Sequence, residues 1–255
     1  MHMYMNIGGL HLPSYGLLIT FGLVSANLIA IALIKKYKLD LMDFIILEAY
    51  SFLGGFLGAK LLYFWVSRSL IEWNKILNLR YFNQLMQSGF VFYGGLIGGI
   101  IFVLIAKKIH QIDAMLYVRK VIFLLPWIHC FGRIGCFMAG CCYGKPYGGH
   151  CSVIFPEGSL APSGIPLFPV QLIEAICLMV IAIVILVLVL KKDLYYSIEI
   201  YIISYSVVRF VLEYFRYDAA RGEFLCFSTS QWISILLFIG ATISILVHHK
   251  KIKDN

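Results

Sequence analysis

Three arginines occupy positions from which they could hold an anion in apolar surroundings. Arg133 interrupts one apolar stretch, and Arg209 and Glu213 lie four residues apart in another. This spacing puts Arg209 and Glu213 on one face of a helix, and a continued helix would add Arg216 to that face. A charge inside a membrane span costs about 2.5–3.5 kcal/mol, so each one needs a partner or a function. Because the guanidinium fork matches a phosphate, the arginines indicate a lipid-phosphate site, with a purely structural ion pair as the alternative.

Cysteines gather around Arg133. Cys130 and Cys136 flank it, and Cys141 and Cys142 follow shortly after. Zinc sites usually pair their ligands at spacings such as C-x2-C, and thiol oxidoreductases use C-x-x-C, but neither pattern is present. The vicinal pair Cys141 and Cys142 leaves disulfide chemistry open. We expect most of these thiols to fill a tightly packed helix end, with no metal and no cofactor.

The elements that carry these residues must be membrane helices. The chain has 255 residues, of which 61% are hydrophobic and 13% charged, and its mean hydropathy is +0.87. This composition excludes an ordinary soluble domain. A membrane-crossing helix takes about 20 apolar residues, which gives length for about seven. We predict an all-α integral membrane protein, a single polytopic domain over residues 1–255, with these spans: Tyr15–Ile34, Ile45–Val66, Phe90–Ala106, Val121–Met138, Val170–Leu190, Ile198–Phe215 and Trp232–Val247.

Basic residues predict the orientation. They follow the first, third, fifth and seventh spans, and by the positive-inside rule these loops are cytoplasmic. The N-terminus is then outside and the C-terminus cytoplasmic. The formal net charge of +8 is explained by this topology rather than by nucleic acid. The outer face carries residues 68–88, interpreted as an interfacial amphipathic arm with an ordinary polar loop as the alternative, and a loop over residues 141–169.

Glycines recur at four-residue spacing in the second and third spans. Gly54 and Gly58 in one, and Gly94 and Gly98 in the other, follow the small-xxx-small pattern of closely packed helices. Gly94 and its neighbour Gly95 follow Tyr93, so they also suit a place where backbone amides approach a ligand.

The stretch from Gly132 to Gly144 reads G-R-x-G-x-F-x-x-G-x-x-x-G. It resembles the signature of the prolipoprotein diacylglyceryl transferases, bacterial membrane enzymes that attach the first lipid to lipoproteins. The resemblance covers nearly the whole chain. Further segments agree in the family's order: Ser14–Gly16, Gly58–Tyr63, Phe92–Gly98, Pro169–Ala175, Arg209–Arg216 and Ser228–Trp232.

The resemblance implies an activity and its partners. A diacylglyceryl group would pass from phosphatidylglycerol to the lipobox cysteine thiol in a prolipoprotein signal peptide, releasing glycerol phosphate, in the bacterial cytoplasmic (inner) membrane. Arg133 and Arg209 match the family's essential arginines, Glu213 would orient Arg209, and Tyr93 completes the expected catalytic set. Other positions are expected to bind substrate: Tyr15, Lys60, Gly94, Gly95, Gly144, Arg216, Cys136 and Cys141.

The sequence departs from the family's usual pattern at the expected site. Tyr93 replaces a histidine, Cys136 an asparagine, Cys141 a glutamate, and Lys60 an arginine. A tyrosine, with a reference pKa near 10, is a weak base at neutral pH. A paralogue of the same fold that uses phosphatidylglycerol with another acceptor is therefore the alternative. A membrane thiol oxidoreductase and a non-enzymatic seven-span protein are less favoured.

Overall fold

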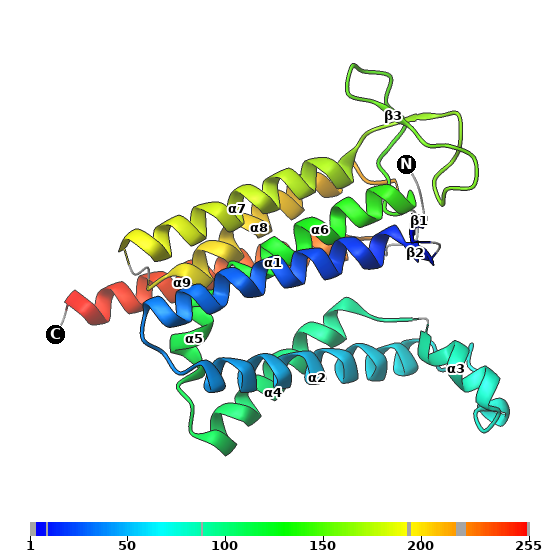
Figure 1. Cartoon of the computed structure of the whole chain (residues 1–255). Coiled ribbons are helices and arrows are strands. Elements are labelled where there is room, and N and C mark those ends of the chain that lie inside the picture. The colour runs from blue at the N-terminus through cyan, green and yellow to red at the C-terminus, as the bar shows by residue number, and fades with distance from the viewer. Residues whose placement is uncertain (1–3, 9, 88, 193–194, 218–222, 254–255) are drawn as a thin grey trace. The chain divides into compact units, whose positions relative to one another are not determined.

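The computed structural model describes residues 4–8, 10–87, 89–192, 195–217 and 223–253 (Figure 1). Every long element among them is a helix, and the strands form three short antiparallel hairpins. The chain divides into two compact units. The first comprises Met1–Leu33 with Val118–Asn255, and the second is Ile34–Tyr117. One boundary falls near the end of α1 (Ser14–Lys36), and the other falls within α5 (Ala114–Val121).

The first unit is a bundle of five helices that run side by side (Figure 1). Successive helices pack on one another from α6 to α9, and the aromatic rings of Phe21 and Phe131 join α1 to α6 at 5.2 Å. Trp127 Nε1 adds a hydrogen bond of 3.0 Å to Ser25 Oγ across the same pair. Helix α7, the most apolar of the candidate spans, carries several fully buried apolar side chains, Leu178 and Ile185 among them. The bundle consists of α1 (Ser14–Lys36), α6 (Leu124–Ala139), α7 (Val170–Lys192), α8 (Ser197–Glu213) and α9 (Thr229–Lys253).

The second unit is built on a close pair of helices, α2 (Leu41–Val66) and α4 (Phe92–His110). Asp40 caps α2, and its carboxylate accepts a hydrogen bond of 2.6 Å from the Met42 amide. The glycines face each other across the pair: Gly58 lies against Gly94, and Gly54 lies against Gly98. The predicted close packing is therefore confirmed, because no side chain separates the two backbones there.

Helix length and composition agree with a membrane protein. Five helices, α1, α2, α4, α7 and α9, are long and apolar enough to cross a bilayer, and α5 with α6 gives a sixth span if the two, bent by 46°, count as one. The segment expected as a further span is α8, which has 17 residues. The all-helical membrane architecture is confirmed with five or six candidate spans in the described chain. The seventh span and the orientation stay predictions.

Two segments between helices carry the remaining structure. The expected amphipathic arm contains a 3₁₀ turn, η1 (Trp73–Lys75), and α3 (Leu79–Gln87), with Leu77 93% exposed beside them. The loop after α6 contains a hairpin of β3 (Val153–Ile154) and β4 (Pro166–Leu167), over a small core that includes Phe155. Placement of both segments at the outer face stays a prediction.

Short hairpins also precede two helices. Before α1 lie β1 (Tyr4–Ile7) and β2 (Leu10–Pro13), paired antiparallel. Before α9 lie β5 (Glu223–Phe224) and β6 (Phe227–Ser228), while part of the connection from α8 falls outside the described residues. The second hairpin brings Ser228 and the first turn of α9 beside the end of α8, where two of the expected site residues lie.

Candidate active site

Glu174 on α7 is the centre of a buried polar cluster in the first unit. Its side chain is fully buried, and Arg133 Nε from α6 lies 3.0 Å from its Oε2 atom. Arg216 Nη1 lies 3.6 Å from the same oxygen, and the Tyr205 hydroxyl of α8 donates to Oε1 at 3.0 Å. A carboxylate is tolerated in such a place only when it is paired and hydrogen-bonded. Glu174 thus ties α6, α7 and α8 to the segment after α8.

A second ion pair lies at the end of α8. Arg209 Nη2 is 2.7 Å from Glu213 Oε2, so the i, i+4 pair expected from the sequence forms. The same nitrogen donates to Ser230 Oγ at 3.0 Å, and Ser228 Oγ donates to Glu213 Oε1 at 3.0 Å. The first turn of α9 and the hairpin before it therefore fix the position of this pair.

The cluster retains positive charge. Three guanidinium groups face two carboxylates, so one formal positive charge is left over. Arg209 Nη1 is buried and makes no hydrogen bond with any described residue. A buried guanidinium donor with an excess of positive charge is suited to an anionic group such as a phosphate.

Arg216 departs from the sequence prediction. We expected it to continue the helical face of Arg209 and Glu213, but α8 ends at Glu213. The following backbone pairs with Gly144 in an isolated bridge, and the Lys145 amide donates to the Phe215 carbonyl at 2.9 Å. This pairing draws the chain out of the helix and directs the Arg216 side chain to Glu174.

Gly144 has a structural reason to be glycine. A Cβ placed there would meet the carbonyl oxygens of Phe168 and Phe215 at less than ordinary contact distance. The missing side chain lets three backbone segments meet: the loop after α6, the residues before α7 and the end of α8. Substrate binding by Gly144 stays a prediction.

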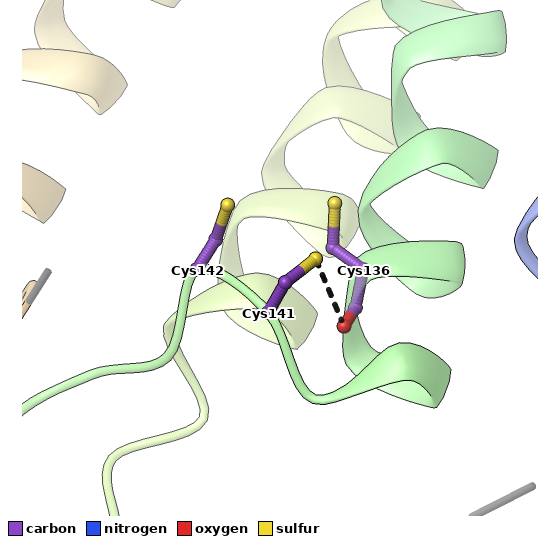
Figure 2. A group of neighbouring side chains, drawn as sticks. All are labelled: Cys136, Cys141 and Cys142. Carbon is purple, nitrogen blue, oxygen red and sulfur yellow. Dashed lines mark hydrogen bonds between the residues drawn. The ribbon is translucent and has the colours of Figure 1, made fainter. Parts of the chain in front are cut away.

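Helix α6 ends in a turn that gathers three thiols. Gly140, with φ of 75°, closes the helix, and the Cys141 amide donates back to the Cys136 carbonyl at 3.1 Å. The Sγ atoms of Cys136, Cys141 and Cys142 all lie within 4.8 Å of one another. Figure 2 shows the three side chains gathered at this turn. Sequence spacing did not predict this grouping. Cys130, by contrast, is buried against α7, in keeping with the expected packing role.

Electrostatics distinguish Cys142 from an ordinary thiol. The neighbouring Cys136 and Cys141 thiols and the positive charge of the Arg216 and Arg133 guanidinium groups all act on its sulfur. These interactions lower the pKa of Cys142 below its usual value, because both favour the thiolate.

Tyr15 joins the same end of the bundle. Its ring packs against the backbone of Gly135 on α6, where a Cβ would not fit. Its hydroxyl is within electrostatic range of Cys136, Cys141 and Arg133. The structure therefore brings together these expected site residues of the first unit: Tyr15, Arg133, Cys136, Cys141, Gly144, Arg209, Glu213 and Arg216.

The remaining expected site residues belong to the second unit. Lys60 is 3% exposed, and its Nζ donates to the carbonyl oxygens of Leu85 at 2.7 Å and Gly89 at 3.2 Å, so it anchors the end of the arm. Gly94 and Gly95 face α2 as packing positions. Tyr93, in the first turn of α4, is 38% exposed. Roles for these four residues in catalysis or binding stay predictions.

Sequence reasoning assigned no role to several members of the cluster. Glu174 was visible as a carboxylate within the most apolar run, and such a charge is a signal for function. Ser228 and Ser230 lay in a segment that matched the family but carried no charge. Tyr205 had no signal, because a tyrosine in an apolar run is ordinary.

The fold and the site define a multi-pass membrane protein with a buried, positively charged arginine cluster beside a group of thiols. Comparison with known proteins gives its family. The sequence profile described as "Prolipoprotein diacylglyceryl transferase" matches residues 2–247. The chain therefore belongs to the prolipoprotein diacylglyceryl transferase family, which confirms the resemblance and the enzyme class predicted from the sequence.

Individual relatives agree over most of the chain. Phosphatidylglycerol–prolipoprotein diacylglyceryl transferase 2 of Clostridium perfringens is 35% identical over 92% of this chain and 90% of its own length. The transferase of Clostridium tetani is 34% identical over 91% of both chains. That of Pasteurella multocida is 28% identical over 95% of this chain and 90% of its own.

Proposed function

We propose that this protein transfers the diacylglyceryl group of phosphatidylglycerol to the thiol of a lipobox cysteine in prolipoproteins. The reaction releases glycerol phosphate and is the first step of lipoprotein maturation. It takes place at the outer leaflet of the bacterial cytoplasmic membrane, in keeping with the orientation predicted from the basic loops. Family membership and the names of the relatives support the donor and the acceptor.

The positively charged arginine cluster is the observation that carries the proposal. Phosphatidylglycerol has one negative charge on its phosphodiester, and the departing glycerol phosphate gains a second one as the carbon–oxygen bond breaks. Arg133 and Arg209 are held by buried carboxylates, so their geometry is set before substrate binds. Fixed cations in a water-poor site stabilise the developing charge without reorganisation, and this is a large contribution to catalysis.

An apolar groove lies on α8, the helix that also carries Arg209. It has a volume of about 220 Å³ and lies between α8 and α9, with Phe210 and Ile235 among its lining residues. Phe210 follows Arg209 directly in α8. If a diacyl lipid binds with its phosphate at Arg209, part of one acyl chain can therefore pack against the apolar surface of the same helix.

The test is transfer in a defined system. The purified chain, reconstituted in vesicles containing phosphatidylglycerol, should add a diacylglyceryl group to the cysteine of a lipobox peptide, as read by mass spectrometry. Arg133→Ala and Arg209→Ala should each lower the rate by about 10²–10³-fold, the usual loss for a donor that stabilises developing charge. Arg119→Ala is the matched control, because Arg119 stacks on Tyr195 outside the cluster.

Two results would count against the proposal. Absence of transfer from a folded, reconstituted wild-type chain would refute the activity. Consumption of phosphatidylglycerol without modification of the lipobox thiol would instead favour the paralogue with another acceptor, which the substitutions at Tyr93, Cys136 and Cys141 first suggested.

A further inference from the structure

The three thiols at the end of α6 have the geometry of a metal site. Cys136, Cys141 and Cys142 lie together at this turn (Figure 2). Each is partly buried, and their Sγ atoms all lie within 4.8 Å of one another. Three thiolates around a tetrahedral zinc ion, with Zn–S bonds of about 2.3 Å, lie about 3.8 Å apart. The sulfurs therefore need to approach one another by at most about 1 Å to bind zinc.

The turn that carries these thiols is held in place before any ion binds. The buried Gln171 side chain donates to the Cys141 carbonyl at 2.8 Å. On the other side of Cys142, the Tyr217 amide donates to the Tyr143 carbonyl at 3.3 Å. A preformed arrangement of ligands lowers the entropy cost of binding, because fewer side chains and backbone segments must be ordered.

The cluster offers three ligands and leaves a fourth position open. Among the described residues, no histidine, aspartate, glutamate or further cysteine belongs to the same group. A zinc site with three protein ligands and one open position is typical of catalytic zinc, whereas structural zinc has four protein ligands.

Nearby arginines balance the charge of such a site. Three thiolates with one zinc ion carry one net negative charge, and a fourth thiolate would add a second. The Arg216 and Arg133 guanidinium groups act electrostatically on Cys142, so positive charge is already present beside the sulfurs.

The expected reaction needs the acceptor thiol to lose its proton. A neutral thiol is a poor nucleophile, and a thiol bound to zinc loses its proton outright. Tyr93, which stands where the family usually has histidine, is a weak base at neutral pH. A zinc-bound acceptor sulfur would meet this need without a histidine.

We propose that Cys136, Cys141 and Cys142 bind one zinc ion through three thiolates, and that the fourth position takes the acceptor thiol. The zinc site stands on the geometry alone, and the role of the fourth position rests on the proposed function. Two of the zinc ligands, Cys136 and Cys141, are residues at which this chain departs from its family. A single change in how the acceptor thiol is activated would therefore account for both substitutions.

The zinc site would use the donor and the acceptor of the proposed reaction. The acceptor thiol binds zinc and releases its proton to water. Its sulfur then attacks the diacylglyceryl carbon bonded to the phosphate oxygen, forming the carbon–sulfur bond while the carbon–oxygen bond breaks. The electron pair of that bond leaves on glycerol phosphate, next to the arginines. The product thioether is neutral and a weaker ligand than a thiolate, so it dissociates.

Metal binding can be measured on the full chain without turnover. Purified wild-type protein, reduced, incubated with Zn²⁺ and freed of excess metal, should retain about one zinc per chain by mass spectrometry of the metal. Cys136→Ser and Cys142→Ser should lose most of it, whereas Cys151→Ser should not, because Cys151 is exposed and outside the cluster. Failure of wild type to retain zinc, or retention by both cluster variants, would overturn the site.

A second measurement on wild type guards against misfolded variants. Zn²⁺ should protect Cys136, Cys141 and Cys142 from alkylation by N-ethylmaleimide, while Cys151 and Cys226 in the same molecule react at an unchanged rate. Both control cysteines are exposed, so they report whether zinc alters alkylation in general. Equal reactivity of the three cluster thiols with and without Zn²⁺ would overturn the proposal.

Cobalt separates the acceptor role from the transferase activity. Co²⁺ bound in the site should give thiolate charge-transfer absorption that increases when a lipobox peptide is added, and a peptide with serine in place of the cysteine should cause no increase. An unchanged spectrum, or full transfer by zinc-free enzyme, would refute the acceptor role and leave the proposed function intact. An increased spectrum without transfer from phosphatidylglycerol would instead refute the proposed function and leave the zinc site intact.

Discussion

Arg133 Nε lies 3.0 Å from Glu174 Oε2, joining α6 to α7 through a carboxylate that is completely buried. Arg216, which follows the end of α8, forms an ion pair with the same oxygen atom, and the Tyr205 hydroxyl donates a hydrogen bond to Oε1 of Glu174. Glu174 therefore sets the position of Arg133 while leaving the cluster positively charged. An ion pair that only held helices together would not need a second arginine at the same carboxylate.

Replacing Glu174 with glutamine tests this relationship. Glu174→Gln keeps the shape of the side chain but leaves Arg133 and Arg216 without their counter-charge in a buried place. Removing one partner of a buried ion pair costs about 3–5 kcal/mol, so we expect a clear drop in the melting temperature of the purified protein and a strong loss of transfer. Thermal unfolding followed by circular dichroism, alongside the transfer assay, checks both.

The matched control removes a carboxylate of the same type at the surface. Glu157 lies exposed in the loop between α6 and α7, so Glu157→Gln should leave melting temperature and rate close to wild type. Equal stability of the Glu174 and Glu157 variants would show that Glu174 does not hold the arginines in the way that the distances indicate.

Arg209→Lys asks whether the guanidinium fork matters beyond its charge. Arg209 contacts Glu213 and Ser230 through Nη2, while its buried Nη1 atom makes no hydrogen bond with any described residue. A lysine has one nitrogen and cannot occupy these positions together. We expect kcat to fall by about 10²-fold with the protein still folded, as for loss of one stabilising donor. A rate near that of wild type would show that charge alone is sufficient at this position.

The sequence predicts the helices well because each signal is local. Long apolar runs with polar ends determine α1, α2, α4, α7 and α9, and the glycines of α2 and α4 identify their close contact. The end of α8 is harder to predict. Its residues continue a helical pattern to Phe215, but pairing of the backbone with Gly144, far away in sequence, ends the helix at Glu213.

The site is predictable only in part, for a similar reason. Arg133, Arg209 and Glu213 are charges in apolar runs, so their cost inside a membrane makes them visible. The meeting of Cys136 with Cys142 depends on positive φ at Gly140 and at Cys142, which reverses the chain after α6. Residue spacing along a helix or an extended chain does not predict that reversal, so it does not predict that the thiols meet.

Gly144→Ala tests whether the backbone junction positions Arg216. The new Cβ would meet the carbonyl oxygens of Phe168 and Phe215, so the loop and the end of α8 must separate. We expect lower thermal stability and reduced transfer as Arg216 moves away from Glu174. Gly148→Ala is the control, since nothing lies within 4 Å of a Cβ there. Similar losses in both variants would mean that the effect comes from the loop in general.

Tyr93→Phe tests the part assigned to the tyrosine hydroxyl. If the hydroxyl helps to position or activate the acceptor thiol, its removal should lower kcat severalfold while the helix stays intact, because the ring is kept. Tyr147→Phe removes a hydroxyl from an exposed tyrosine in the loop after α6 and should be neutral. An unchanged rate in Tyr93→Phe would restrict Tyr93 to packing and strengthen the case for zinc as the activator.

Gly58→Ala tests whether the glycines of the second unit serve packing. A Cβ at Gly58 would run into the Gly94 carbonyl, whereas a Cβ at Gly55 would sit 3.6 Å from the Gly95 carbonyl, an ordinary contact. Gly58→Ala should therefore force α2 and α4 apart and lower the melting temperature, and Gly55→Ala should be tolerated. Both changes add one methyl group to the same helix, so intrinsic helix propensity rises equally and cannot explain a difference. If instead both variants kept wild-type stability and only transfer was lost in Gly58→Ala, the close approach of the two backbones would serve a ligand rather than the fold.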